Sequence, residues 1–131
     1  MNQRPTFENA LGPLGQAAMN GHFEIVKLLI EAGADVDQRS DGGMTAFFVS
    51  CSMGHANIAR LLEANGANVQ LTITGGATAL LAAVGLGHVE VVRYLLTESN
   101  YDTSGDGNAI LAAESFGNEE IMRLFREAGL L

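Results

Sequence analysis

The stretch GHFEIVKLLIEAGADVD, residues 21–37, decides the fold because the chain repeats it three more times. Related stretches are GHANIARLLEANGANVQ at 54–70, GHVEVVRYLLTESNYD at 87–102 and GNEEIMRLFREAGLL at 117–131. The glycines that open them are spaced by 33, 33 and 30 residues, so the last interval is three residues shorter. A period of this length predicts small units that bury their apolar faces only by stacking on one another.

Each unit predicts a pair of helices. Short apolar segments precede the opening glycines, namely PLGQAAMN, AFFVSCSM, ALLAAVGL and AILAAESF. After each glycine, apolar residues recur at i, i+1, i+3 and i+4, which form one face of an α-helix. In the first unit this face comprises Ile25, Val26, Leu28 and Leu29.

Glycines also predict where these helices end. The opening glycine separates two antiparallel helices, and a second glycine (Gly33, Gly66 or Gly129) is predicted to cap the end of the second helix. Between units, DQRSDGGMT, QLTITGGAT and DTSGDGN contain Gly-Gly or Asp-Gly pairs, which favour tight hairpin-like turns.

Together these marks resemble the ankyrin repeat, whose period is about 33 residues and whose motifs include T-P-L-H-x-A, Gly-His and G-A-D. The matching segments are GPLGQAA, TAFFVSC, TALLAAV and NAILAAE, with three Gly-His pairs and a GAD or GAN after two of the second helices. The sequence departs from the family at the histidine of T-P-L-H, which is replaced by Gly15, Phe48, Leu81 and Leu111.

The resemblance implies an all-α fold, an α-solenoid of four stacked ankyrin-like helix-turn-helix repeats with projecting hairpin-like loops. We expect a single domain over residues 1–131, since this length suits one continuous core. The repeats are expected at about 8–39, 40–72, 73–102 and 103–131.

The net charge of the chain limits the classes of molecule that it is expected to bind. Seven Lys and Arg against 15 Asp and Glu give a net charge of −8. Nucleic-acid binding depends on basic residues that neutralise phosphates, so we expect no nucleic-acid partner and no membrane, whereas a protein with a basic surface is compatible. No segment reaches the ~18 apolar residues of a membrane span, and the N-terminal residues have no apolar run of signal-peptide length. With a single cysteine, Cys51, and no internal disulfide, the chain is predicted to be cytoplasmic.

The three histidines His22, His55 and His88 recur with the repeat. Equivalent positions on stacked helices lie about 8–10 Å apart, too far for three side chains to share one metal ion. They are therefore interpreted as structural residues at the start of each second helix. Cys51 stands where other units have small or apolar residues and is interpreted as a packing residue.

The segment 102–114 resembles a calcium loop in its first half. Asp102, Ser104, Asp106 and Gly107 match its positions 1, 3, 5 and 6, but Ala113 stands where the bidentate glutamate belongs. A tight turn is the preferred interpretation. We predict no metal site, no cofactor and no catalytic residue.

Charged residues on the second helices are predicted to face solvent. The basic ladder consists of Lys27, Arg60, Arg93 and Arg123, and in three units a glutamate stands three residues earlier: Glu24, Glu90 and Glu120. Glu119 and Arg126 replace apolar residues in the last unit and suit an end with no neighbour. Glu63 replaces an apolar residue in an inner unit and is expected to reach solvent.

In the ankyrin family, loop tips and inner-helix faces commonly bind other proteins. The positions that match these surfaces are the loop residues Asp41, Met44, Thr74 and Ser104 and the inner-helix residues Met53, Leu86 and Phe116. The last three, with Asn20, form a row just before the opening glycines and predict a semi-exposed apolar ridge. The alternative is that these side chains are ordinary packing between units. Asp41 and Asp106 are expected to form a polar rim.

The resemblance thus implies a non-enzymatic protein-protein interaction module, an adaptor or inhibitor that binds its partner through the concave face and loop tips as a monomer. One alternative is a structural or assembly protein that self-associates through the ends of the solenoid. Another alternative is an enzyme. Catalytic turnover that disappears on mutation of Cys51 or His22 would indicate it.

Overall fold

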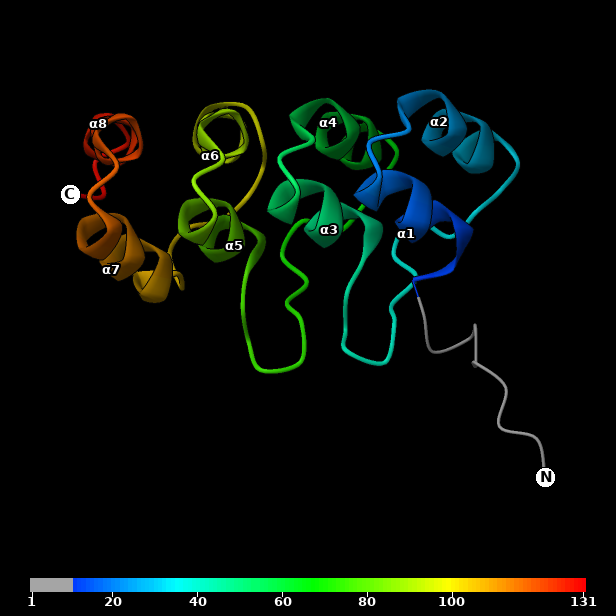
Figure 1. The fold of residues 1–131 in the computed structure, drawn as a ribbon, viewed down its shortest axis with the longest axis horizontal. Helices are drawn as coiled ribbons and strands as arrows, with labels where there is room; N and C mark the ends of the chain where they lie inside the picture. The colour runs from blue at the N-terminus through cyan, green and yellow to red at the C-terminus, as the bar shows by residue number, and fades with distance from the viewer. Residues whose placement is uncertain (1–10) are drawn as a thin grey trace.

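The computed structural model describes residues 11–131 and shows eight helices and no strand within them. Consecutive helices form pairs, and the pairs stack side by side into a solenoid with an inner row (α1, α3, α5, α7) and an outer row (α2, α4, α6, α8) (Figure 1). This confirms the predicted architecture. The helices are α1 Gly12–Met19, α2 Phe23–Glu31, α3 Ala46–Ser52, α4 Ala56–Ala64, α5 Ala79–Gly85, α6 Val89–Thr97, α7 Gly107–Phe116 and α8 Glu119–Glu127.

Local sequence explains where the helices begin and end. The Thr45 and Thr78 hydroxyls cap α3 and α5 by accepting hydrogen bonds from Phe48 N and Leu81 N, each at 3.0 Å. Gly54 follows α3 with φ +83°, a left-handed conformation that glycine adopts without steric cost. In the second and third repeats, the threonine and the glycine therefore fix the two ends of the inner helix.

The core runs the length of the stack between the two rows. In α4, three residues of the apolar face, Ile58, Ala59 and Leu62, are fully buried, and the fourth, Leu61, is partly buried. The largest fully buried side chains come from both rows, and they include Phe47, Leu80, Leu95, Ile121 and Phe125. Because each repeat contributes only a few of these, the repeats stabilise one another.

The prediction for the first outer helix was wrong in part. Val26 is fully buried as predicted, but Ile25 is 49 % exposed and Leu28 62 % exposed. The equivalent side chains in α6 and α8 are buried, and so is Ile58 in α4, whereas Leu61 in α4 is partly buried. Among residues 11–131, no helix pair precedes α2 (Figure 1), so half of its apolar face remains in solvent.

Glu63 reaches solvent in part, as predicted, but it is also bonded to the next repeat. Its carboxylate is partly buried and accepts hydrogen bonds from the Tyr94 hydroxyl and, at 2.9 Å, from Asn100 N. Burial by itself would raise the pKa of Glu63, but these bonds and one from Ser99 outweigh it and lower the pKa. Glu63 therefore joins the second repeat to the third.

Two long loops project from the inner row, before α3 and before α5, whereas the connection before α7 is short (Figure 1). The two long loops are bonded to each other. Thr74 N donates to Gly42 O at 2.8 Å, and Arg39 Nη2 donates to Thr72 O at 2.6 Å. The shortened third interval in the sequence corresponds to a connection without this projection.

Candidate protein-binding surface

Three large apolar side chains stand at the ends of three consecutive inner helices. Met53 and Leu86 are the C-caps of α3 and α5, and Phe116 is the last residue of α7. They are 50 %, 61 % and 62 % exposed. We call Met53, Leu86 and Phe116 the apolar ridge. Asn20, the C-cap of α1, is the exposed polar member of the same row.

Small residues stand next to the ridge in the sequence. The positions before the ridge residues are Ser52, Gly85 and Ser115. A Cβ atom on Gly85 would lie 3.7 Å from Phe116 Cε2, so the aromatic ring lies beside the Gly85 backbone. Phe116 thereby reaches from the fourth repeat to the third, next to Leu86. Sequence reasoning missed Gly85, although its place beside Leu86 was visible.

The predicted loop residues fall into two groups. Asp41, Met44 and Thr74 are exposed in the two long loops, which the Thr74–Gly42 hydrogen bond holds together. Ser104 is exposed in the short connection before α7, where its N–H donates to Asp102 Oδ1 at 2.9 Å. The structure therefore places the first three in a joined pair of loops and Ser104 in a separate turn.

The expected role of Asp106 in the polar rim was wrong. Its side chain is buried, and its carboxylate accepts hydrogen bonds from Tyr101 Oη and from Thr78 Oγ1, at 3.0 and 3.1 Å. Burial, followed by this bond to Asp106, raises the pKa of Tyr101. Asp106 thus fastens the short connection to the third repeat, and its oxygens are already used there.

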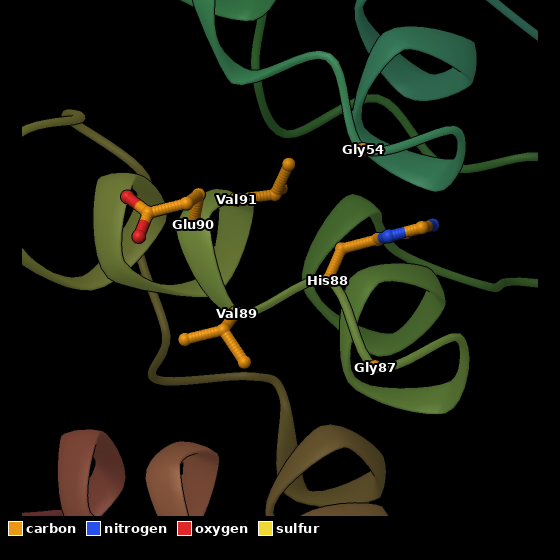
Figure 2. A pocket seen from close by; sticks show the side chains of 6 residues that line it. All are labelled: Gly54, Gly87, His88, Val89, Glu90 and Val91. Carbon is orange, nitrogen blue, oxygen red and sulfur yellow. The ribbon is translucent and has the colours of Figure 1, made fainter.

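Two of the histidines bridge neighbouring repeats. His55 Nε2 lies 3.1 Å from Met19 O, and His88 Nε2 lies 2.8 Å from Ser52 O. Figure 2 shows the His88 ring between the turns that carry Gly54 and Gly87, at a shallow pocket of about 260 Å³. The ring packs so closely on Gly54 that a Cβ there would lie 2.8 Å from His88 Nδ1. The Gly-His pairs therefore supply both partners of a contact between repeats.

The outer helices hold most of their basic groups in ion pairs. Arg123 pairs with Glu120 three residues earlier, and Arg93 pairs likewise with Glu90. Arg60, which has no such glutamate, makes a bidentate pair with Glu98 at 2.8 and 3.0 Å. The Arg60–Glu98 hydrogen bond lowers the pKa of Glu98. Arg60 also lies 5.4 Å from the centre of the Tyr94 ring.

Cys51, the one cysteine of the chain, is a packing residue. Cys51 is fully buried, and this burial raises the pKa of its thiol, which keeps it in the unreactive protonated form. Within residues 11–131, no three His, Cys, Asp or Glu side chains are grouped so that they could hold a metal ion. No helix in this same range is long and apolar enough to cross a bilayer.

Comparison with known proteins agrees with this geometry. The family model described as ankyrin repeats (3 copies) matches residues 2–73 and 65–130. Human protein phosphatase 1 regulatory subunit 27 is 41 % identical over 44 residues, which are 34 % of this chain and 29 % of that protein. The E3 ubiquitin-protein ligase XBAT33 of Arabidopsis thaliana is 50 % identical over 46 residues, which are 35 % of this chain and 9 % of the ligase.

Each relative thus shares about a third of this chain, and the matched part spans less than a third of the relative. The likeness to the relatives is confined to a short segment, whereas the family model accounts for nearly the whole sequence. The chain belongs to the ankyrin repeat family.

Proposed function

We propose that this chain binds a partner protein through the apolar ridge and the joined loops, and that it acts as an adaptor or inhibitor rather than as an enzyme. The observation that carries the proposal is the exposure of Met53, Leu86 and Phe116 on three successive repeats. Large apolar groups gathered on a surface mark interaction sites, and methionine and aromatic side chains are effective contacts in interfaces.

The rest of the surface indicates the chemistry of the partner. The net charge of −8 favours a protein with a basic surface, which would be drawn to the exposed carboxylates. Asp41, Met44, Thr74 and Ser104 would provide contacts around the ridge. The buried thiol of the single cysteine suits a reducing compartment, so we place this activity in the cytoplasm.

The relatives support a regulatory class of role. One is named as a regulatory subunit of a phosphatase and another as a ubiquitin ligase. An ankyrin module that occupies a partner's surface can serve either to recruit it or to block it.

The test is affinity capture from the source cell, followed by mass spectrometry and by a binding titration with the purified partner. Changing Met53, Leu86 and Phe116 together to Ser should abolish binding while the melting temperature stays within a few degrees, because all three are exposed. Leu111→Ser is the matched control, since Leu111 is 61 % exposed on α7 outside the ridge. A large fall in melting temperature, or unchanged binding, would contradict the proposal.

A further inference from the structure

The two long loops end in matching hairpin-like turns, residues 40–44 and 73–77, which we call the first turn and the second turn. Each is closed by a main-chain hydrogen bond between its first and last residues, at 2.9 Å in the first turn and 3.1 Å in the second. Each residue of the first turn corresponds to the residue 33 positions later in the second. The connection before α7 forms no third projecting turn (Figure 1).

The second turn covers one edge of the first. Gly42 O accepts a hydrogen bond from Thr74 N at 2.8 Å. The Gly43 backbone lies so close to the second turn that a Cβ on Gly43 would stand 2.8 Å from Thr74 N. The edge of the first turn is therefore occupied by the main chain of its neighbour.

The same edge of the second turn is open. Its residues Gly75 and Gly76 correspond to Gly42 and Gly43. Among the described residues, nothing beyond the chain neighbours lies within 4 Å of a Cβ on Gly75 or Gly76. No donor within residues 11–131 bonds to Gly75 O. We call Gly75 and Gly76 the open edge, and it exists because the last interval of the repeat is three residues shorter.

A pocket of about 300 Å³ lies at the foot of the second turn, between this turn and the short connection before α7. The residues that line it include Gln70, Thr72, Thr78, Tyr101, Asp102 and Asp106. Among the described residues, no Lys or Arg lines it. Asp102 is exposed, and the hydrogen bond from Ser104 N lowers the pKa of its carboxyl group, which is therefore ionised at neutral pH. The pocket is negatively charged.

The two loops differ at the residue that reaches across to the next loop. Arg39 spans from the first loop to the second, where its guanidinium donates to Thr72 O. Thr72 is the corresponding residue of the second loop, and its side chain is short and uncharged. Arg39 is also the one basic residue of the two loops. The chain therefore supplies no long basic side chain to the pocket beside Thr72.

We propose that the open edge and this pocket together bind an extended segment of the partner protein. A main-chain N–H of the segment donates to Gly75 O, and a lysine or arginine of the segment enters the pocket beside Asp102. The first turn already shows the main-chain part of this recognition, because its glycine carbonyl accepts from the neighbouring backbone in the same way. The negative charge of the pocket selects the basic side chain.

This inference deepens the proposed function and rests on it for the nature of the occupant. Thr78 and Leu86 stand at opposite ends of α5, about 12 Å apart along its axis. One partner can therefore contact the pocket beside Thr78 and the apolar ridge at Leu86 together.

The test is a titration of the full chain with a defined peptide, followed by the NMR chemical shifts of the backbone amides. The probe is an end-capped pentapeptide of valine and threonine around a central arginine, because these residues favour extended structure. Gly75, Gly76 and Asp102 should shift. A peptide with glutamate in place of arginine, and one with methylated amide nitrogens, should each bind roughly fivefold more weakly or worse. Equal binding of the three peptides, or no shift at the open edge up to the solubility limit, overturns the proposal.

A matched pair of variants isolates the pocket. Asp102→Asn should weaken binding of the arginine peptide by roughly twofold to fivefold, because it removes an exposed charge. Asp35→Asn is the control, since Asp35 is exposed in the first repeat and accepts from Asp37 N at 3.0 Å, as Asp102 does from Ser104 N at 2.9 Å. It should bind the peptide like the wild type. Equal weakening in both variants would assign the effect to net charge and overturn the pocket.

The peptide titration separates this inference from the proposed function. The variant with Met53, Leu86 and Phe116 changed to Ser should bind the peptide like the wild type, because the ridge lies at the other end of the inner helices. Loss of partner capture in that variant with no peptide binding in the wild type would leave the ridge standing and refute the open edge. Shifts of Gly75 and Gly76 that follow protein concentration without peptide would assign the edge to a second copy of the chain and overturn the proposal.

Discussion

The outer helices of the first two repeats have nearly the same apolar pattern but different surroundings. FEIVKLLIE in α2 and ANIARLLEA in α4 share an isoleucine at the same position and leucines further along. Ile58 is completely buried, and Ile25 is half exposed. The comparison shows that a repeat determines which of its residues can be buried, while its neighbour determines which of them are buried.

The junctions between repeats differ in the same way. At the first and second junctions a histidine ring reaches back to the preceding repeat. At the third, Asn118 stands in place of histidine and caps its own helix by accepting a hydrogen bond from Ile121 N at 3.1 Å. That junction is held instead by the Asp106 carboxylate and its two hydroxyl donors. Junctions of different chemistry are expected to have different strengths.

The largest effect is expected from removing the buried member of the isoleucine pair. Ile58→Ala should lower the free energy of unfolding by about 2–5 kcal/mol, because it leaves a cavity between repeats. Ile25→Ala should cost less than about 1 kcal/mol, because the side chain is half exposed. Urea denaturation at low protein concentration measures both. Equal losses in the free energy of unfolding would show that α2 is covered in solution and would contradict the difference between the two helices.

The next effect distinguishes a junction that has a bridging histidine from one that lacks it. Gly54→Ala and Gly87→Ala should each cost about 1–2 kcal/mol, because both glycines have positive φ. Gly54→Ala should cost about 1 kcal/mol more, since its Cβ displaces the His88 ring from Ser52 O. No atom lies within 4 Å of a Cβ on Gly87, which makes it the control. Identical losses of stability would mean that the histidine contact contributes nothing.

A smaller effect is expected at the polar link between the second and third repeats. Tyr94→Phe should cost about 1 kcal/mol, because it removes the hydroxyl that donates to Glu63. Since the folded state lowers the pKa of Glu63, its contribution to stability is present above about pH 4.5, the ordinary value, and is lost as the pH falls below it.

Thermal unfolding across acid pH tests this sign. Glu63→Gln should flatten the loss of stability between neutral and acid pH. The interpretation fails if Glu63→Gln unfolds with the same pH dependence as the wild type.

The smallest difference is expected between whole repeats. Hydrogen exchange should show α7 and α8 opening before the helices of the first three repeats, because the last junction has no bridging histidine and its outer end carries Glu119 and Arg126. Mass spectrometry of peptic fragments resolves the order. Uniform protection across all eight described helices would contradict this ranking.

The sequence predicted the helix pairs because their signals are local. The period, the glycine turns and the apolar spacing lie within one repeat, and the helices were found where those signals placed them. The exposure of Ile25 and the burial of Asp106 depend on atoms supplied by other repeats, so the sequence prediction for these two residues was wrong. Glu63 shows this most clearly, because nothing near it in the sequence indicates the Tyr94 hydroxyl 31 residues later.

The apolar ridge was predicted in part from the sequence. Its residues precede glycines whose positive φ turns the chain out of the inner helix, and this local rule predicts that the side chains leave the core. Whether they adjoin one another depends on the stacking of repeats, which brings the Phe116 ring beside the Gly85 backbone. The periodicity of the sequence does not by itself predict the contact between Phe116 and Gly85.

The hydrogen bond between Thr74 N and Gly42 O, together with the Arg39–Thr72 contact, has a consequence for recognition. Separate surface loops lose conformational entropy when a partner orders them, and that loss weakens binding. Here the two loops are already ordered against each other before any partner arrives. A partner that touches both therefore meets one preformed platform, and most of its contact energy remains available as affinity.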